Sequence, residues 1–245
     1  MIYGRDALTD PQRAYAVGDE TFGRAICMAG GSYTTWNAYI AKNDTKCIGN
    51  PENNLGEQIL FESGATLVSS YAVAYTATSV TFADGVDLSG LTRDRMIGIL
   101  DGRGKRQYRV ITSVSGQTVE IGEPWTVMPD STSYFVAGKF YRDIVVYANT
   151  QMAFTNVTDG QNASCGIGGP CNTVGLIVDS NHYSDMNTPV GIYSVVERKN
   201  GRDLYDVLAW ARFDRNTAER TKNGFGLRVF YSGSDDDTTV HDGAV

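Results

Sequence analysis

The chain has 245 residues, of which 42% are hydrophobic and 20% are charged, a balance typical of a folded protein rather than a disordered one. No run approaches about 18 apolar residues, which excludes a membrane-spanning helix and predicts no membrane insertion. The formal net charge of −7 argues against a nucleic-acid partner, because binding phosphates needs a concentrated basic face.

The composition predicts an all-β fold. Glycine occurs 27 times and tyrosine 14 times, proline occurs only 6 times, and long segments rich in Ala, Leu, Glu and Lys are missing. β-branched and aromatic residues favour strands, whereas Gly and Asn favour turns. The N-terminus has no basic start followed by an apolar core, so we expect no retained signal peptide.

In chain order, residues 1–71 read as a loop-rich β segment whose main apolar run is Ile59–Phe61. Residues 72–139 read as a small antiparallel β module. There, Asp101-Gly102 is a hairpin signal between two strand-like runs, and Ser115–Gln117 marks a second turn.

Residues 140–245 have a different rhythm, in which similar segments recur. Residues 143–150, 175–182 and 206–213 align with offsets of 32 and 31, and the strand-like segments 191–197 and 226–232 are offset by 35. Short apolar strands at such a period predict stacked coils that share one core. A β-sandwich is the alternative, but its strands would recur every 8–12 residues or so.

From residue 76 to 233 the chain resembles the right-handed parallel β-helix proteins of the pectate-lyase-like superfamily, found in extracellular polysaccharide-degrading enzymes and phage tailspikes. The resemblance is carried by DGRGKRQYR at 101–109, by YRDIVVYANT at 141–150 and by GLIVDSNHYSDMNTPVGIYSV at 175–195. It implies a right-handed parallel β-helix over residues 140–245, preceded by the antiparallel module. The coils are few and no cap is recognisable, so we expect a truncated set of coils, from a fragment or from one component of a larger assembly.

Strand alternation predicts which side chains of the coils face solvent. An unpaired charge is costly in a core, so Asp179 should point outward together with Ile177 and Asn181. The repeat then places Tyr147 and Trp210 on the same outer ladder as Asp179, with Asn149 and Arg212 beside Asn181. Aromatic faces can stack on sugar rings, and polar groups can pair with hydroxyls, so we expect a glycan groove. The alternative is that these residues pack against a loop or another subunit.

No motif arranges a catalytic site. Asp179, Asp185, Glu197 and Arg198 are the candidates, since a glycosidase needs two facing carboxylates. The resemblance implies that a lyase would instead use a cation, with Ca²⁺ as the candidate, and a basic side chain. No protein ligands for a metal are assigned. Cys165 and Cys171 bracket a Gly/Pro-rich loop that suits a local disulfide and free thiols equally, and a zinc site is disfavoured by the spacing.

The sequence therefore predicts an extracellular β-helix protein that binds or cleaves polysaccharide or a cell-surface glycan. If it is an enzyme, we expect a polysaccharide lyase or a glycoside hydrolase. The alternative is a non-catalytic structural or receptor-binding part of a phage tailspike or fibre, which the resemblance implies to be a homotrimer on the virion surface.

Overall fold

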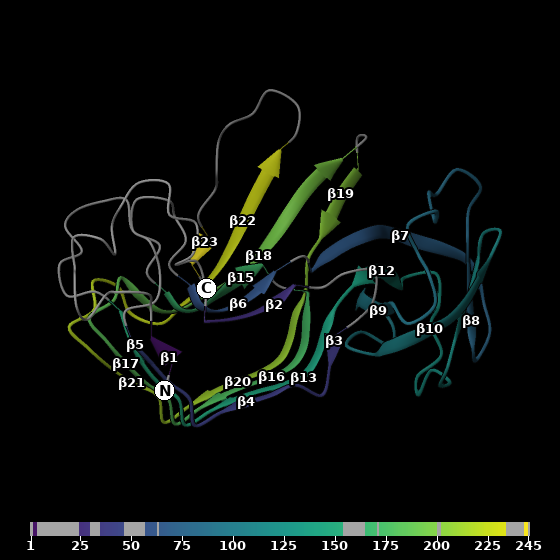
Figure 1. The fold of residues 1–245 in the computed structure, drawn as a ribbon. Helices are drawn as coiled ribbons and strands as arrows, with labels where there is room; N and C mark the ends of the chain where they lie inside the picture. Colours follow the sequence, from purple (N-terminus) through teal and green to yellow (C-terminus); the bar gives the residue numbers. More distant parts are fainter. Residues whose placement is uncertain are drawn as a thin grey trace.

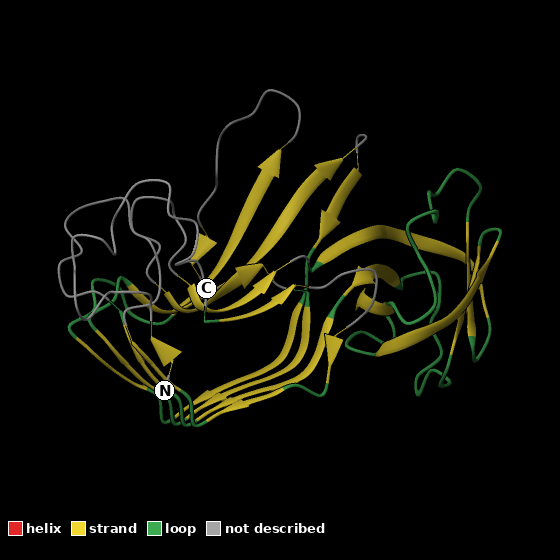
Figure 2. Cartoon of the chain, viewed as in Figure 1, coloured by secondary structure: helices red, strands yellow, loops and turns green. Residues whose placement is uncertain are grey.

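Three mainly parallel sheets and one antiparallel barrel make up the part of the chain that the computed structural model describes (Figure 1). That part comprises residues 2–3, 25–29, 35–46, 57–62, 64–153, 165–170, 172–199, 202–233 and 243–244. Its regular structure is β-strand throughout (Figure 2), which confirms the all-β prediction. None of these residues belongs to a helix that could span a membrane.

Sheet I has the strand order β20-β16-β13-β3, and β4 also pairs with β13. Sheet II has the order β1-β5-β14-β17-β21, and sheet III has the order β2-β6-β15-β18-β22-β23 with β19 attached to β18. The strands of sheet I are β3 (Thr35–Trp36), β4 (Tyr39–Ala41), β13 (Tyr141–Tyr147), β16 (Thr173–Asp179) and β20 (Leu208–Asp214). Those of sheet II are β1 (Ile2–Tyr3), β5 (Asp44–Lys46), β14 (Thr150–Met152), β17 (His182–Ser184) and β21 (Thr217–Glu219). Those of sheet III are β2 (Ile26–Ala29), β6 (Glu57–Glu62), β15 (Cys165–Pro170), β18 (Thr188–Lys199), β19 (Arg202–Tyr205), β22 (Gly226–Gly233) and β23 (Gly243–Ala244).

The chain visits sheets I, II and III in the same order each time, and we call one such passage a rung. Rungs run through β13, β14 and β15, then β16, β17 and β18, then β20, β21 and β22. Equivalent strands of successive rungs pair in parallel, as in Ile144↔Leu176↔Ala211. This repetition is what the resemblance to parallel β-helix proteins implies. The predicted 35-residue offset is confirmed by the pair Gly191↔Gly226.

The N-terminal segment is part of the same stack. Strand β4 pairs with β13, β5 with β14, and β6 with β15, all in parallel, so these three strands contribute an earlier rung. One hydrophobic core lies between the three sheets and draws residues from each of them, including Ile144, Leu176, Tyr183 and Ile167. The apolar run Ile59–Phe61 is buried, and both Ile59 and Phe61 belong to this core.

The antiparallel module is a closed six-stranded barrel inserted between β6 and β13. Its two end strands pair with each other, since Ala65 lies opposite Lys139. Both predicted turns connect antiparallel barrel strands, with positive φ at Gly102 and Gly116. The barrel strands are β7 (Ala65–Tyr75), β8 (Ser79–Phe82), β9 (Met96–Asp101), β10 (Tyr108–Ser115), β11 (Thr118–Ile121) and β12 (Tyr134–Lys139).

Apolar and polar contacts fix the barrel against sheet I. Met96 and Val136 of the barrel share a buried cluster with Val174 and Val207 of the rungs. The Thr66 backbone N–H donates to Asp206 Oδ1 at 3.0 Å, and Thr66 Oγ1 donates to the Tyr205 carbonyl at 2.8 Å. The barrel therefore closes one end of the outer side of sheet I.

Candidate functional site

Two columns of left-handed residues shape sheet I. The first column crosses the sheet part-way along its strands, and the second lies at the corner where sheet I meets sheet II. The first comprises Asn37, Asp143, Gly175 and Trp210, with φ values of 54°, 53°, 77° and 57°. The second comprises Lys42, Ala148, Ser180 and Arg215, with φ values of 57°, 52°, 56° and 49°. A left-handed residue interrupts the alternation of a strand, so the residues on either side of it no longer follow a simple in-and-out pattern.

Because of this interruption, the predicted outward orientation of Asn149 and Asn181 is wrong. Both follow a left-handed corner residue and both are only 1% exposed, so they face inward instead of outward. They stand in a ladder with Asn43 and Asn216, in which the side-chain amide of one rung donates to the side-chain oxygen of the next at 2.9 Å. They satisfy buried backbone groups at the corner, and from there they cannot reach a bound polymer.

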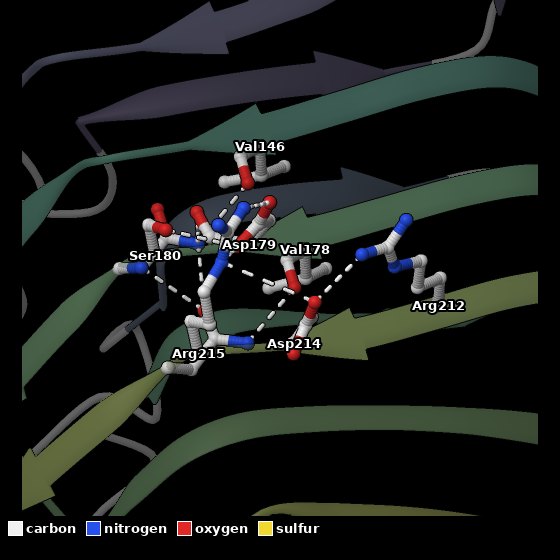
Figure 3. Close-up of polar contacts among 9 residues, drawn as sticks. Val146, Val178, Asp179, Ser180, Arg212, Asp214 and Arg215 are labelled. Carbon is white, nitrogen blue, oxygen red and sulfur yellow. Dashed lines mark hydrogen bonds and ion pairs between the residues drawn. The ribbon is translucent and has the colours of Figure 1, made fainter.

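Asp179 lies in one row with Tyr147, as predicted, and Asp214 completes that row, but Asp179 is only 8% exposed instead of open to solvent. Arg215 Nε donates to Asp179 Oδ1 at 3.0 Å, a second nitrogen of Arg215 bonds the other oxygen, and Ser180 Oγ donates to Oδ1 at 2.9 Å (Figure 3). The Arg215 guanidinium is the main cause that holds the pKa of Asp179 below its usual range. This carboxylate therefore stays ionised and bonded to the next rung.

Asp185 is held in the same way one corner later. Arg220 donates to its two oxygens at 2.6 and 2.8 Å, and this guanidinium keeps the pKa of Asp185 low. Asp179 and Asp185 lie beyond the two ends of β17, a strand of three residues that spans roughly 10 Å. A retaining glycosidase pair is separated by about 5 Å and an inverting pair by about 6.5–9.5 Å. The structure thus does not bring these two carboxylates together as a catalytic pair.

Two other predicted catalytic residues lie late in β18. Glu197 is opposite Leu204 and Arg198 is opposite Asp203 in the backbone ladder between β18 and β19. Their side chains are outside the described part of the structure, so their role stays a prediction. Among the described residues, no group of three or more His, Cys, Asp or Glu side chains is placed to hold a metal ion.

Cys165 is a buried free cysteine whose Sγ lies 2.8 Å from the Ile167 carbonyl oxygen. Burial raises the pKa of its thiol to about 12. Cys171 lies outside the described residues. At Cys165 the structure has the free thiol, one of the two alternatives that the sequence left open.

The solvent side of sheet I, which we call the outer face, carries exposed aromatic and apolar side chains. Tyr39, Val145, Ile177 and Arg212 form one row across it. Exposure reaches 46% for Trp36, 66% for Tyr39, 38% for Ile177 and 62% for Trp210. Large exposed apolar groups that gather on one surface mark interaction sites. From interstrand spacing and rise, the face measures roughly 14 Å across the strands and 13 Å along them.

Trp210 lies on this face, but not in the row of Asp179. The pairs Val174↔Ala209 and Leu176↔Ala211 place it beside Gly175, four residues before Asp214, which is the true partner of Asp179. Arg212 is likewise beside Ile177 rather than Asn181. The predicted register is wrong because the alignment of the repeat matched Val207 with Ile144. In the structure, Val207 instead packs in the buried cluster against the barrel.

Trp210 combines a strained backbone with an exposed side chain. A left-handed conformation costs a non-glycine residue roughly 1–2 kcal/mol, and bulky residues adopt it rarely. The indole is mostly exposed, so little burial compensates this cost. On the neighbouring strand, a Cβ added to Gly175 would lie 2.8 Å from Asp143 Oδ1, so the Asp143 carboxylate occupies the space that a side chain at this position would need. Such strain is concentrated at functional sites.

Several residues of this surface escaped the sequence prediction. Arg215 would have emerged as the partner of Asp179 if the repeat had been aligned on Asn149, Asn181 and Asn216. Trp36 and Tyr39 could be placed only once the N-terminal segment was known to form a rung.

No protein-family model matches this chain, and no curated protein sequence does. Three solved tailspike structures are similar to it. The tailspike gp49 of Pseudomonas phage LKA1 has 12% identity and a TM-score of 0.32, covering 81% of this chain and 41% of the tailspike. The tailspike gp61 of Pseudomonas phage phi297 has 14% identity and a TM-score of 0.28, covering 89% and 40%.

The third is the Gp54 tailspike of Acinetobacter baumannii bacteriophage AP22, in complex with a capsular saccharide of that bacterium. It has 12% identity and a TM-score of 0.24, covering 80% of this chain and 51% of the tailspike. This chain thus spans about half or less of each tailspike it matches. Superpositions this loose carry no statement about the site, which rests on the geometry of the outer face.

Proposed function

We propose that this chain is a polysaccharide-binding unit of a right-handed parallel β-helix protein, and that a polymer lies along the outer face. The observation that carries the proposal is Trp210, an exposed indole on a strained left-handed backbone, beside Gly175 on the neighbouring strand. Trp36, Tyr39 and Ile177 extend this apolar surface to the other strands. Stacking of sugar rings on aromatic faces would use such a surface.

The proposal places binding rather than cleavage on this face. Asp179 and Asp185 are each bonded to an arginine of the next rung, and they lie at different corners. Such pairs hold rungs together and leave neither carboxylate as a general acid, which would need a raised pKa. We extend to this chain the class of ligand seen with the AP22 tailspike, a capsular saccharide. The resemblance to phage tailspikes adds to the proposal a place on the virion surface and a homotrimeric assembly.

Binding to bacterial surface polysaccharides, measured by titration calorimetry, tests the proposal. We expect Trp210→Ala and Tyr39→Ala each to weaken binding by about tenfold or more, equivalent to about 1.4 kcal/mol. Tyr71→Ala is the matched control, because Tyr71 is an exposed aromatic residue of the barrel. Unchanged affinity in folded Trp210 and Tyr39 variants would refute the proposal. The proposal would also be refuted if the wild-type protein bound no polymer and its self-association depended on Trp210, because the face would then be a subunit contact.

A further inference from the structure

The charges of the outer face cancel in pairs. Arg142 Nε donates to Asp143 Oδ2 at 2.8 Å, within β13. Arg212 donates to Asp214 Oδ2 at 2.6 Å, within β20, and the close-up shows the two side chains turned toward each other (Figure 3). Arg215 reaches back from the corner to Asp179. Three guanidinium groups are thereby matched by three carboxylates on the same surface.

The pairing covers nearly all the charge that the described strands and corners of sheet I carry. Lys42 is the further cation there, and it lies at the corner on the opposite edge of the sheet from Arg215. The pKa of Asp179 is lowered and that of Arg215 raised by their mutual contact, so both stay charged near neutral pH. Apart from Lys42 at its far edge, the charges of the face therefore sum to zero, in a chain whose net charge is −7.

Such a surface discriminates against anionic polymers. A uronate that accepts from a free N–H of one of these arginines would lie beside Asp143, Asp179 or Asp214. That carboxylate already neutralises the guanidinium and would repel the uronate. The negative net charge of the chain opposes the approach of a polyanion as well.

The same pairs suit the hydroxyl groups of neutral sugars. A hydroxyl group both donates and accepts, so it can bond the outer edge of a paired carboxylate or of a paired guanidinium without breaking the pair. The rings would stack on Trp210 and Tyr39, and hydroxyl groups would reach the ion pairs beside them. Asp143 Oδ1 lies against Gly175, on the strand next to Trp210, and can accept a hydrogen bond from such a hydroxyl group.

We infer that the outer face recognises neutral glycan chains and rejects uronate-rich ones, with the Arg–Asp pairs as the selecting groups. This inference rests on the proposed function and narrows its class of ligand. It also predicts which substitution reverses the preference. Asp214→Asn removes the negative charge that neutralises Arg212 and keeps the shape of the site, so the variant should gain affinity for anionic polymers.

The experiment uses an array of bacterial surface polysaccharides of known composition, with every acidic polymer immobilised both intact and after reduction of its uronates to neutral sugars. We expect the wild-type protein to bind neutral polymers, and to bind the reduced form of an acidic polymer at least about tenfold more tightly than the intact form. Its affinity for neutral polymers should change little as salt is raised. Asp214→Asn should gain affinity for intact acidic polymers, and the gain should disappear at high salt, whereas the matched control Asp101→Asn on the exposed end of β9 should gain nothing.

The outcomes separate the two proposals. Tighter, salt-sensitive binding of intact acidic polymers by the wild-type protein would overturn the neutral preference and leave polysaccharide binding standing. Equal behaviour of Asp214→Asn and Asp101→Asn would overturn the assignment of the Arg–Asp pairs as the selecting groups. Binding of no polymer in either form would overturn the proposed function itself.

Discussion

Two substitutions at Trp210 separate the strain of its backbone from the contacts of its side chain. Trp210→Ala and Trp210→Gly remove the same indole, but only glycine adopts φ near 57° without steric cost. The left-handed conformation costs alanine about 1–2 kcal/mol, whereas glycine loses about 0.5–1 kcal/mol more entropy on folding. Trp210→Gly should therefore be the more stable of the two, by about 0.5–1 kcal/mol.

Urea unfolding, supported by thermal melting, measures this difference. For a chain of this size, 1 kcal/mol corresponds to about 2–4 °C in Tm. The control is Ala211→Gly, one residue later in β20, which is not among the residues with positive φ and should lose about 0.5–1 kcal/mol. A glycine that destabilises position 210 relative to alanine, as it does position 211, would refute the strained geometry. Both Trp210 variants should lose polysaccharide binding equally.

Three further predictions concern the scaffold. Asn181→Ala should lower the free energy of unfolding by about 3 kcal/mol, because it removes the acceptor of the buried Asn149 backbone N–H and the side-chain donor to the Val146 carbonyl. Asn223→Ala, on the exposed ladder to Asn187, should cost less than about 1 kcal/mol. Urea midpoints measure both losses, and equal losses would contradict the buried ladder. Because the pKa of Asp185 is lowered in the folded chain, its pairing with Arg220 stabilises the protein above the unfolded pKa of about 4, and this stabilisation is lost as pH falls through the folded pKa. Urea midpoints measured between about pH 6 and 2 should therefore fall less steeply for Asp185→Asn than for the wild type. Identical slopes would argue against the pair. Gly102→Ala should lower the free energy of unfolding by about 3 kcal/mol, since its Cβ would collide with the Thr132 carbonyl. Gly85→Ala should lower it by only about 1–2 kcal/mol, because nothing lies within 4 Å of its Cβ. Thermal melts that shift equally would contradict the turn geometry.

The strand pattern of the sequence was enough to predict the architecture of the rungs. Strand alternation predicted that Ile177 points outward, and Ile177 is exposed while its neighbours Leu176 and Val178 are buried. The 35-residue offset between 191–197 and 226–232 gave the correct register in sheet III, because both segments lie in uninterrupted strands.

The site could be predicted only in part, because left-handed residues change the alternation without an obvious signal. Ser180 and Arg215 are not glycines, so nothing in their identity marks the corner, and Asn181 was placed on the wrong side. The buried asparagines were the usable signal, since a recurring Asn after a strand suits a turn whose backbone groups need a partner. Aligning the third repeat on Asn216 would have placed Asp214 beside Asp179 and Trp210 beside Gly175.

The meeting of Ala65 and Lys139 has a consequence for how this architecture can vary. Because the chain leaves the stack after β6 and returns at β13 from nearly the same point, the rungs on either side keep their register whatever lies between them. Closing a longer excursion costs little additional entropy, since that cost grows only with the logarithm of its length. Related chains could therefore exchange the barrel for a domain of another size, and their rungs would still present the same surface to a ligand.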